Sequence, residues 1–174
     1  MTATLDQYKT KSVWLIGKLI ADFKLTDFQA AGICGNGYQE SMLQPVLEND
    51  GIVTTPTRGI GWFQWTGPRH TAFVTFCSSA NLDWHTDDAE YGFLKHELQT
   101  DHAFVLGHLR PTTTLADATA VFEKFYEGAG VVQMAHRLTG AQIALDAWHA
   151  QQSAAAAVAS STAPAGAIQP QSSG

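Results

Sequence analysis

The sequence contains few basic side chains, and they are scattered along the chain. Ten Lys and Arg stand against sixteen Asp and Glu among 174 residues, which gives a formal net charge of −6. Nucleic-acid binding depends on concentrated positive charge, and anionic lipid repels an acidic chain, so neither nucleic acid nor a membrane is an expected partner. With 45% hydrophobic residues and no internal repeat, the composition fits one folded domain with a sizeable core.

Cysteines and long apolar runs are also scarce. Cys34 and Cys77 lie in the apolar stretches AAGICGNGY and TAFVTFCSSA, where small buried side chains are favoured over a disulfide or a redox pair. The N-terminal segment has only VWLIG at 13–17 between polar residues, which is too short for a secretion signal or a membrane span. We therefore expect synthesis in a cytoplasm, without a signal peptide.

Motifs for metals and cofactors are missing. The pair His96-Glu97 is not followed by a second histidine at the zinc-protease spacing, and His102 and His108 have no cysteine nearby. No glycine-rich phosphate loop is present, and Ser41 has no histidine base within its motif. We therefore expect no metal, no cofactor and no serine-hydrolase chemistry.

What the sequence does contain is a series of helix starts. Thr4 with Gln7 and Thr26 with Gln29 each form a capping-box pattern, which predicts a helix ending near residue 23 and a second one ending before Pro45. Further helices are expected to begin at Pro68, at Asp87 or Asp88, at Thr114 and near Val131, the last running to about His149.

Residues 51–66 differ from the helical segments. Short β-prone runs at 52–55 and 62–66, separated by glycines, predict a small hairpin, so the fold class is α+β and predominantly α-helical. Residues 1–150 form the predicted domain. Residues 151–174, which have no charge and few large apolar groups, are predicted to be a disordered or tethering tail.

Glu40 is the acidic residue whose position stands out. It follows Ile33 by seven positions, so at about 100° per residue both side chains project from nearly the same side of the second helix. A carboxylate at the end of a mostly apolar helix face fits a solvated last-turn glutamate, a salt-bridge partner for a residue such as Arg69, or a catalytic acid.

Three glycines in the same helix, at positions 32, 35 and 37, favour a central location for it. Each glycine costs about 0.8–1 kcal/mol relative to alanine in a helix. Close packing of a neighbouring helix on these positions would account for them. It would also place the helix in the centre of the domain, with Glu40 at an end that opens into a cleft.

The segment GIGWFQWTGPR predicts one wall of that cleft. Aromatic rings suit the C–H faces of sugars, while amides and hydroxyls suit sugar hydroxyl and N-acetyl groups. Strand alternation would put Trp62, Gln64 and Thr66 on one face and Phe63 and Trp65 on the other. One face would then belong to the core and the other to the cleft.

These elements together resemble the phage tail lysozyme family of the lysozyme-like superfamily. The stretches AAGICGNGYQES, GIGWFQWTGPRH and FEKFYEGAG, followed by Arg137, carry the resemblance over roughly residues 5–150. Members often have a proline directly after the Y-E pair, where this chain has Gly128. The resemblance implies an α-rich lysozyme-like fold with a small β element, and action on the glycan strands of peptidoglycan.

The resemblance also implies that Glu40 is the catalytic acid. It would protonate the glycosidic oxygen and must then carry a proton near neutral pH, which a partly apolar pocket favours. The predicted substrate-binding side chains are Tyr38, Ser41, Trp62, Gln64, Trp65 and Thr66.

A second catalytic carboxylate is expected because many glycosidases use a pair of them. Glu48 and Asp50 follow the first acid at an interval that suits a chain folding back over the cleft, although END-G also fits a simple turn. Glu127 is a third candidate, favoured as a salt-bridge partner of Arg69 or Arg137. If none of the three lies near the first acid, a single-acid transglycosylase mechanism gains weight.

The leading hypothesis is a muramidase that serves tail-associated wall penetration or lysis. It would be made in the host cytoplasm and carried in a virion or released through a holin-type pore, with peptidoglycan as substrate and tail or baseplate proteins as further partners. The alternatives are a lytic transglycosylase on the same substrate and a non-catalytic tail or baseplate protein with a lysozyme fold.

Overall fold

The computed structural model describes residues 4–48, 53 and 55–162, so the predicted site residue Asp50 lies outside the described residues. Helices α1 (Leu5–Phe23) and α2 (Asp27–Ser41) both begin with complete capping boxes, built on Thr4 and Thr26. Each box pairs two backbone N–H groups that the helix itself leaves free. The two helix starts predicted from the sequence are confirmed.

The later helices also follow local start signals. Pro68 occupies the first turn of its helix and Thr114 caps another, both as predicted, whereas Thr86 rather than Asp87 or Asp88 caps the helix between them. The elements are α3 (Pro68–Ala80), α4 (Asp87–Gln99), α5 (Ala103–Leu109), α6 (Leu115–Phe122), the π-helix η2 (Glu123–Glu127) and α7 (Met134–Thr162).

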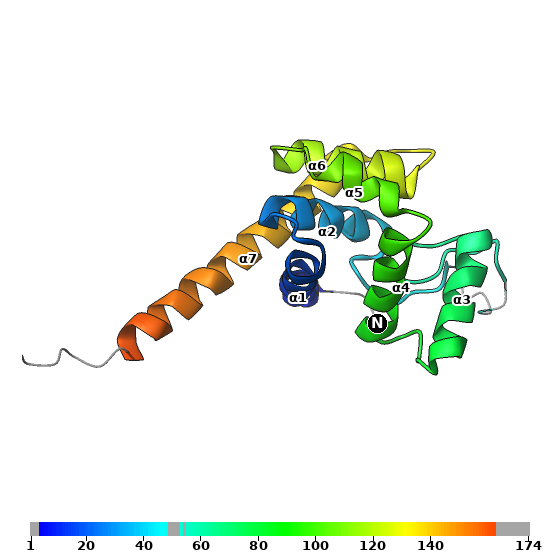
Figure 1. Cartoon of the computed structure of the whole chain (residues 1–174), viewed down its shortest axis with the longest axis horizontal. Helices are drawn as coiled ribbons and strands as arrows, with labels where there is room; N and C mark the ends of the chain where they lie inside the picture. The colour runs from blue at the N-terminus through cyan, green and yellow to red at the C-terminus, as the bar shows by residue number, and fades with distance from the viewer. Residues whose placement is uncertain (1–3, 49–52, 54, 163–174) are drawn as a thin grey trace, which may run out of the picture.

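Helix α2 lies in the centre of the fold. In Figure 1 it runs between α1 on one side and α5 and α6 on the other, while α3 and α4 form a separate flank. A Cβ on Gly32 would lie 2.9 Å from the backbone nitrogen of Thr119 in α6, and one on Gly35 would lie 2.4 Å from the carbonyl oxygen of Arg137 in α7. The predicted close packing on the glycine-rich helix is confirmed.

Helix α7 is longer than expected and extends away from the rest of the molecule (Figure 1). The predicted helix ended near residue 149, but the helix continues to Thr162. Alanine has the highest helix propensity, so the alanine run of residues 151–162 continues the helix where its weak apolar content had predicted disorder. The last helix thus ends later than predicted, residues 163–174 lie outside the described residues, and the tethering role of the tail stays a prediction.

The segment between α2 and α3 contains no hairpin within its described residues, so the predicted β element is not confirmed. It has two isolated antiparallel bridges, Leu47 with Ile60 and Ile60 with Trp65. Gly61 and Gln64 have positive φ angles of 76° and 47°, which turn the chain back within a few residues. The run expected to extend as a strand is therefore a tight loop.

No helix among the described residues is long and apolar enough to cross a membrane.

Candidate active site

Glu40 lies in the last turn of α2 and pairs with Arg137 in the first turn of α7. Nη2 of Arg137 is 2.6 Å from Oε1 of Glu40. The Arg137 side chain is only 1% exposed, whereas that of Glu40 is 22% exposed. The salt-bridge partner of Glu40 is therefore Arg137 and not Arg69, and its surroundings are more polar than the apolar pocket expected from the sequence. The pair leaves one side of the carboxylate open to solvent.

Asn36 holds the Arg137 guanidinium from the interior of α2. Its Oδ1 accepts a hydrogen bond from Nη1 of Arg137 at 3.0 Å, and its Nδ2 donates to the carbonyl oxygens of Gly32 and Thr119 at 2.9 and 3.1 Å. Nε of Arg137 donates to the carbonyl oxygen of Val132 at 2.8 Å. All three guanidinium nitrogens are thus bonded, which fixes the position from which Arg137 contacts the glutamate.

Glu127, the last residue of η2, is a carboxyl group electrostatically coupled to this pair. Burial, followed by the charge of Glu40, raises its pKa from 4.5 to about 8, against the opposing influence of Arg69 and Arg137. Its Oε1 is buried and has no hydrogen-bond partner among the described residues. Burial without a partner therefore favours the neutral form of Glu127. The two arginines expected to pair with it form their ion pairs with Glu97 and Glu40 instead.

A second arginine–glutamate pair contacts η2, and no sequence pattern indicated it. Arg69 donates through Nε and Nη2 to both oxygens of Glu97, each at 2.8 Å. Tyr126 completes the cluster, since its hydroxyl donates to Oε2 of Glu97 at 2.5 Å and its carbonyl oxygen accepts from Nη1 of Arg69 at 3.0 Å. Trp65 Nε1 donates to the same hydroxyl at 3.1 Å. The cluster joins α3, α4 and η2.

The tryptophans predicted to bind sugar are buried. Trp62, Phe63 and Trp65 are 0%, 2% and 1% exposed. The predicted alternation of a core face and a cleft face is therefore wrong, because the tight turns at Gly61 and Gln64 replace a strand with a loop whose three rings all point inward. Trp62 and Trp65 belong to the core, and their rings expose almost no surface to a sugar.

Of the other predicted substrate-binding residues, Ser41 fastens this loop to α2 and Gln64 bonds within the loop. Ser41 donates through Oγ to the carbonyl oxygen of Trp62 at 2.8 Å, and Gln64 donates through Nε2 to that of Gly61 at 2.8 Å. Thr66 is exposed. The Ser41 contact ties the residue directly after Glu40 to the aromatic loop.

Tyr38 is half-buried at the same end of α2. Its ring packs between those of Tyr8 and His136, with centroid distances of 4.7 and 4.8 Å. The ring nitrogen Nδ1 of His136 lies 2.5 Å from Oε1 of Gln39. These contacts hold the start of α7, and with it Arg137, against the end of α2.

Glu90 anchors the loop from α4, a role that no sequence motif indicated. Its side chain is fully buried, and Oε2 accepts a hydrogen bond from the backbone nitrogen of Trp62 at 2.8 Å. Burial raises its pKa well above the ordinary value. Glu90 and Ser41 thus hold the backbone nitrogen and the carbonyl oxygen of the same residue, Trp62.

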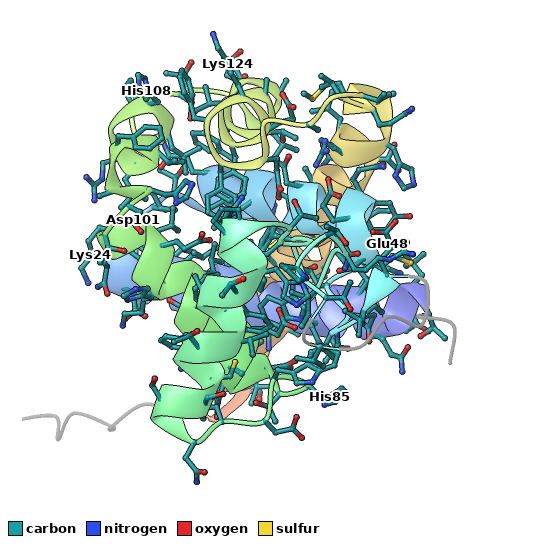
Figure 2. All side chains as sticks on the ribbon, turned by 90° about the vertical axis from the view of Figure 1, so that its right-hand side faces the viewer. Lys24, Glu48, His85, Asp101, His108 and Lys124 are labelled. Atoms are coloured by element: carbon teal, nitrogen blue, oxygen red, sulfur yellow. The ribbon has the colours of Figure 1, made fainter. Side chains whose placement is uncertain are left out.

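Glu48 lies at the surface, on the opposite side of the view from Lys24 and Asp101 in Figure 2. Its backbone nitrogen donates to the carbonyl oxygen of Gly59 at 2.9 Å, and its Oε2 accepts from the nitrogen of Gly59 at 3.2 Å. The structure therefore shows Glu48 fastening two loop segments together. Its predicted pairing with Glu40 stays a prediction.

The described residues include no group of three or more His, Cys, Asp or Glu side chains that could hold a metal ion. Both cysteines, Cys34 and Cys77, are free and buried, which confirms their prediction as core residues.

Comparison with protein families gives a match over most of the chain. The family model described as phage tail lysozyme matches residues 13–148. This span includes both arginine–glutamate pairs and the carboxyl group between them. A comparison with curated proteins gave no match.

Proposed function

The chain belongs to the phage tail lysozyme family, and on that premise we propose that it is a muramidase that hydrolyses the glycan strands of peptidoglycan. Membership indicates a lysozyme-like activity on peptidoglycan, of the glycoside hydrolase or transglycosylase type. The observation that carries the finer proposal is the position of Glu40. It is solvent-accessible at the end of the central helix, backed by the buried Arg137 and coupled to the carboxyl group of Glu127.

In the proposed reaction, Glu40 donates a proton to the glycosidic oxygen. The bond between that oxygen and the sugar carbon breaks, its electron pair stays with the oxygen, and positive charge develops on the carbon. Arg137 fixes the carboxyl group in position, because its own nitrogens are held by Asn36 and Val132. Water then adds to the carbon, an O–H bond of that water breaks and its proton returns to the Glu40 carboxylate, which leaves a reducing end.

Hydrolysis is favoured over transglycosylation by the presence of a second carboxyl group. The sequence left three candidates for it, of which Glu127 interacts electrostatically with Glu40. Glycoside hydrolases commonly use two carboxyl groups, the second of which acts as a base or a nucleophile. We therefore propose Glu127, in place of Glu48 or Asp50, as the second carboxyl group, a role that requires it to ionise when the substrate is bound.

The proposed site of action is the cell wall, which the protein would reach as part of a phage tail or after release at lysis. The family description supports the tail as the place of work. Tail or baseplate proteins are then the proposed partners in the virion, and peptidoglycan is the proposed substrate.

The test is a turbidity assay on chloroform-treated Gram-negative cells, followed by mass analysis of the released muropeptides. We expect clearing and reducing muramyl ends with the wild-type protein, and no clearing with Glu40→Gln. Anhydro-muramyl ends would replace the hydrolase by a lytic transglycosylase. Intact cells, under conditions where a known muramidase clears them, would mean a structural tail protein.

A further inference from the structure

We propose that a pocket beside the N-terminal half of α1 binds an N-acetylated sugar of the glycan strand, away from the bond that is cleaved. The pocket has a volume of about 540 Å³, which is within the range of small-ligand sites. Its lining combines one indole ring with amide, hydroxyl and charged side chains, from Trp14, Gln7, Thr10, Lys11, Gln44 and Asp87. The inference rests on the proposed function and extends it to a second contact with the same substrate.

Trp14 supplies the aromatic surface that the loop tryptophans do not. It is half-buried, whereas Trp62 and Trp65 are buried. The rings of Trp62 and Tyr91 meet it at 86° and 80°, with centroid distances of 6.3 and 5.6 Å, and these contacts hold its orientation. An indole that is already held and partly exposed can pack against the C–H face of a sugar at little cost in side-chain freedom.

Uncharged hydrogen-bonding groups surround this ring. Gln7 and Thr10 are exposed side chains of α1, and Gln44 is half-buried in the segment that follows α2. Amide and hydroxyl groups both donate and accept hydrogen bonds. The hydroxyl and N-acetyl groups of a sugar need partners of both kinds, so the lining suits them.

The charges of the pocket favour an uncharged ligand. Nζ of Lys11 is 2.7 Å from Oδ1 of Asp87, so the positive charge is already paired. The other charged lining residue, Asp6, is an exposed carboxylate. An acidic stem peptide of peptidoglycan would meet a paired lysine and a like charge. The sugar chain is therefore the part of the substrate that fits.

Contacts through Ser41 connect the pocket to the site of Glu40. The backbone nitrogen of Gln44 donates to Oγ of Ser41 at 3.1 Å, and this Oγ donates to the carbonyl oxygen of Trp62 at 2.8 Å. The ring of Trp62 in turn meets that of Trp14. Because Ser41 directly follows Glu40, this arrangement allows one glycan strand to contact both the catalytic acid and the pocket.

The first test measures kcat and KM separately on soluble, uncross-linked glycan strands. Trp14→Ala should raise KM by about tenfold and leave kcat unchanged, because a contact away from the cleaved bond binds substrate and transition state equally. Trp14→Phe keeps an aromatic face and should raise KM less. Gln44→Ala removes a lining amide without removing a ring from the core, and it should raise KM by about threefold.

Trp84→Ala is the matched control. Trp84 is also a half-buried tryptophan packed against the core, but its ring stacks on that of His85 at 3.8 Å and does not line the pocket. Its KM should match that of the wild type. An unchanged KM in Trp14→Ala and Gln44→Ala, or an equal rise in Trp84→Ala, would overturn the inference. If Trp14→Ala does not fold, Trp14→Phe and Gln44→Ala decide.

A second test needs no cleavage. Nitrogen-15 NMR follows the indole N–H signals of the wild-type protein during titration with tri-N-acetylchitotriose, an uncharged sugar that carries N-acetyl groups. The Trp14 signal should shift and the Trp84 signal should not. A Trp14 signal that stays in place, or that shifts only with the acidic dipeptide alanylglutamate, would overturn the inference. If the wild type fails to cleave peptidoglycan, the proposed function fails, while this titration still decides whether the pocket binds sugar.

Discussion

Two arginine–glutamate pairs interact electrostatically with Glu127, and they differ in how completely their partners are bonded. Arg69 and Glu97 meet through two parallel contacts of 2.8 Å, and the tyrosine hydroxyl of η2 adds a third bond to the glutamate. Arg137 and Glu40 meet through one contact of 2.6 Å. The Glu97 side chain is 6% exposed and that of Glu40 is 22% exposed.

The difference separates a structural ion pair from a reactive one. A bidentate pair whose two carboxylate oxygens both accept hydrogen bonds fixes the geometry of the elements that it joins. A glutamate bonded at one oxygen and open at the other can be held in place and still contact a substrate. The comparison therefore predicts that the two pairs will respond differently to the same kind of substitution.

The largest expected effect is on activity, at the pair of Glu40 and Arg137, called the open pair here because Glu40 is partly exposed. Glu40→Gln should lower kcat/KM on peptidoglycan by about 10²–10⁴-fold, the usual contribution of a general acid. The melting temperature should change little, because glutamine keeps an oxygen for Arg137. A folded Glu40→Gln protein with undiminished activity would remove Glu40 from the mechanism.

At the pair of Arg69 and Glu97, the closed pair, the effect should be on the free energy of unfolding. Glu97→Ala leaves the Arg69 guanidinium without its carboxylate, and breaking a buried pair in this way costs about 3–5 kcal/mol. Urea denaturation measures it. Asp22→Asn is the control, since the exposed pair of Asp22 with Lys95, at 2.9 Å, should contribute about 0.2–1 kcal/mol. Equal losses of unfolding free energy in both variants would mean that the buried pair stabilises the fold no more than an exposed one.

The contrast between the pairs also shows what sequence could predict. The helix starts at Thr4 and Thr26 depend on side chains three residues apart, so a local pattern was enough to find them. Glycines that cost helix stability indicated close packing on α2, because the cost needs a compensating contact. Glu40 was singled out because it is a carboxylate at the end of a mostly apolar face of that helix.

The partners of these residues could not be predicted, because they are distant in sequence. Arg137 lies 97 positions from Glu40, and Glu97 lies 28 positions from Arg69. No periodicity links residues so far apart, and the exact pairing depends on how four α-helices and a π-helix converge. The buried Trp62 was misplaced for a local reason: a strand alternates its side chains, whereas a loop with two positive-φ residues does not.

The carboxyl group between the pairs predicts a pH dependence of stability. Glu127 has a pKa of about 8 in the folded protein against an ordinary value of 4.5. Between these values the folded state binds more protons than the unfolded state, so the free energy of unfolding falls as the pH rises from about 4.5 to 8. The loss should be on the order of a few kcal/mol.

Glu127→Gln should remove that component. The melting temperature of the variant minus that of the wild type should therefore increase as the pH rises from about 4.5 to 8. Parallel thermal scans at several pH values measure this difference. A constant gap between the two proteins would mean that Glu127 does not titrate there.

Asn36→Ala should weaken the positioning of Arg137 in the open pair. The substitution removes the acceptor for Nη1 of Arg137 at 3.0 Å, and an unpaired buried donor costs about 1–3 kcal/mol. Activity should fall as well, since Arg137 then holds Glu40 less firmly. Gln142→Ala, an exposed residue of α7 whose amide donates to Asp146, is the control and should have nearly no effect. Asn36→Ala with normal activity would mean that Arg137 positions the acid without help.

The smallest expected effect is at Glu48, the carboxylate that the sequence placed closest after Glu40. Glu48→Gln keeps an oxygen that can accept from Gly59, as Oε2 does at 3.2 Å, and it removes only the charge. Because Glu48 is exposed and fastens a loop, kcat/KM should change by less than about threefold, within the range of surface substitutions. A loss of two orders of magnitude would instead make Glu48 the second catalytic carboxylate. Glu127 would then have no part in the reaction.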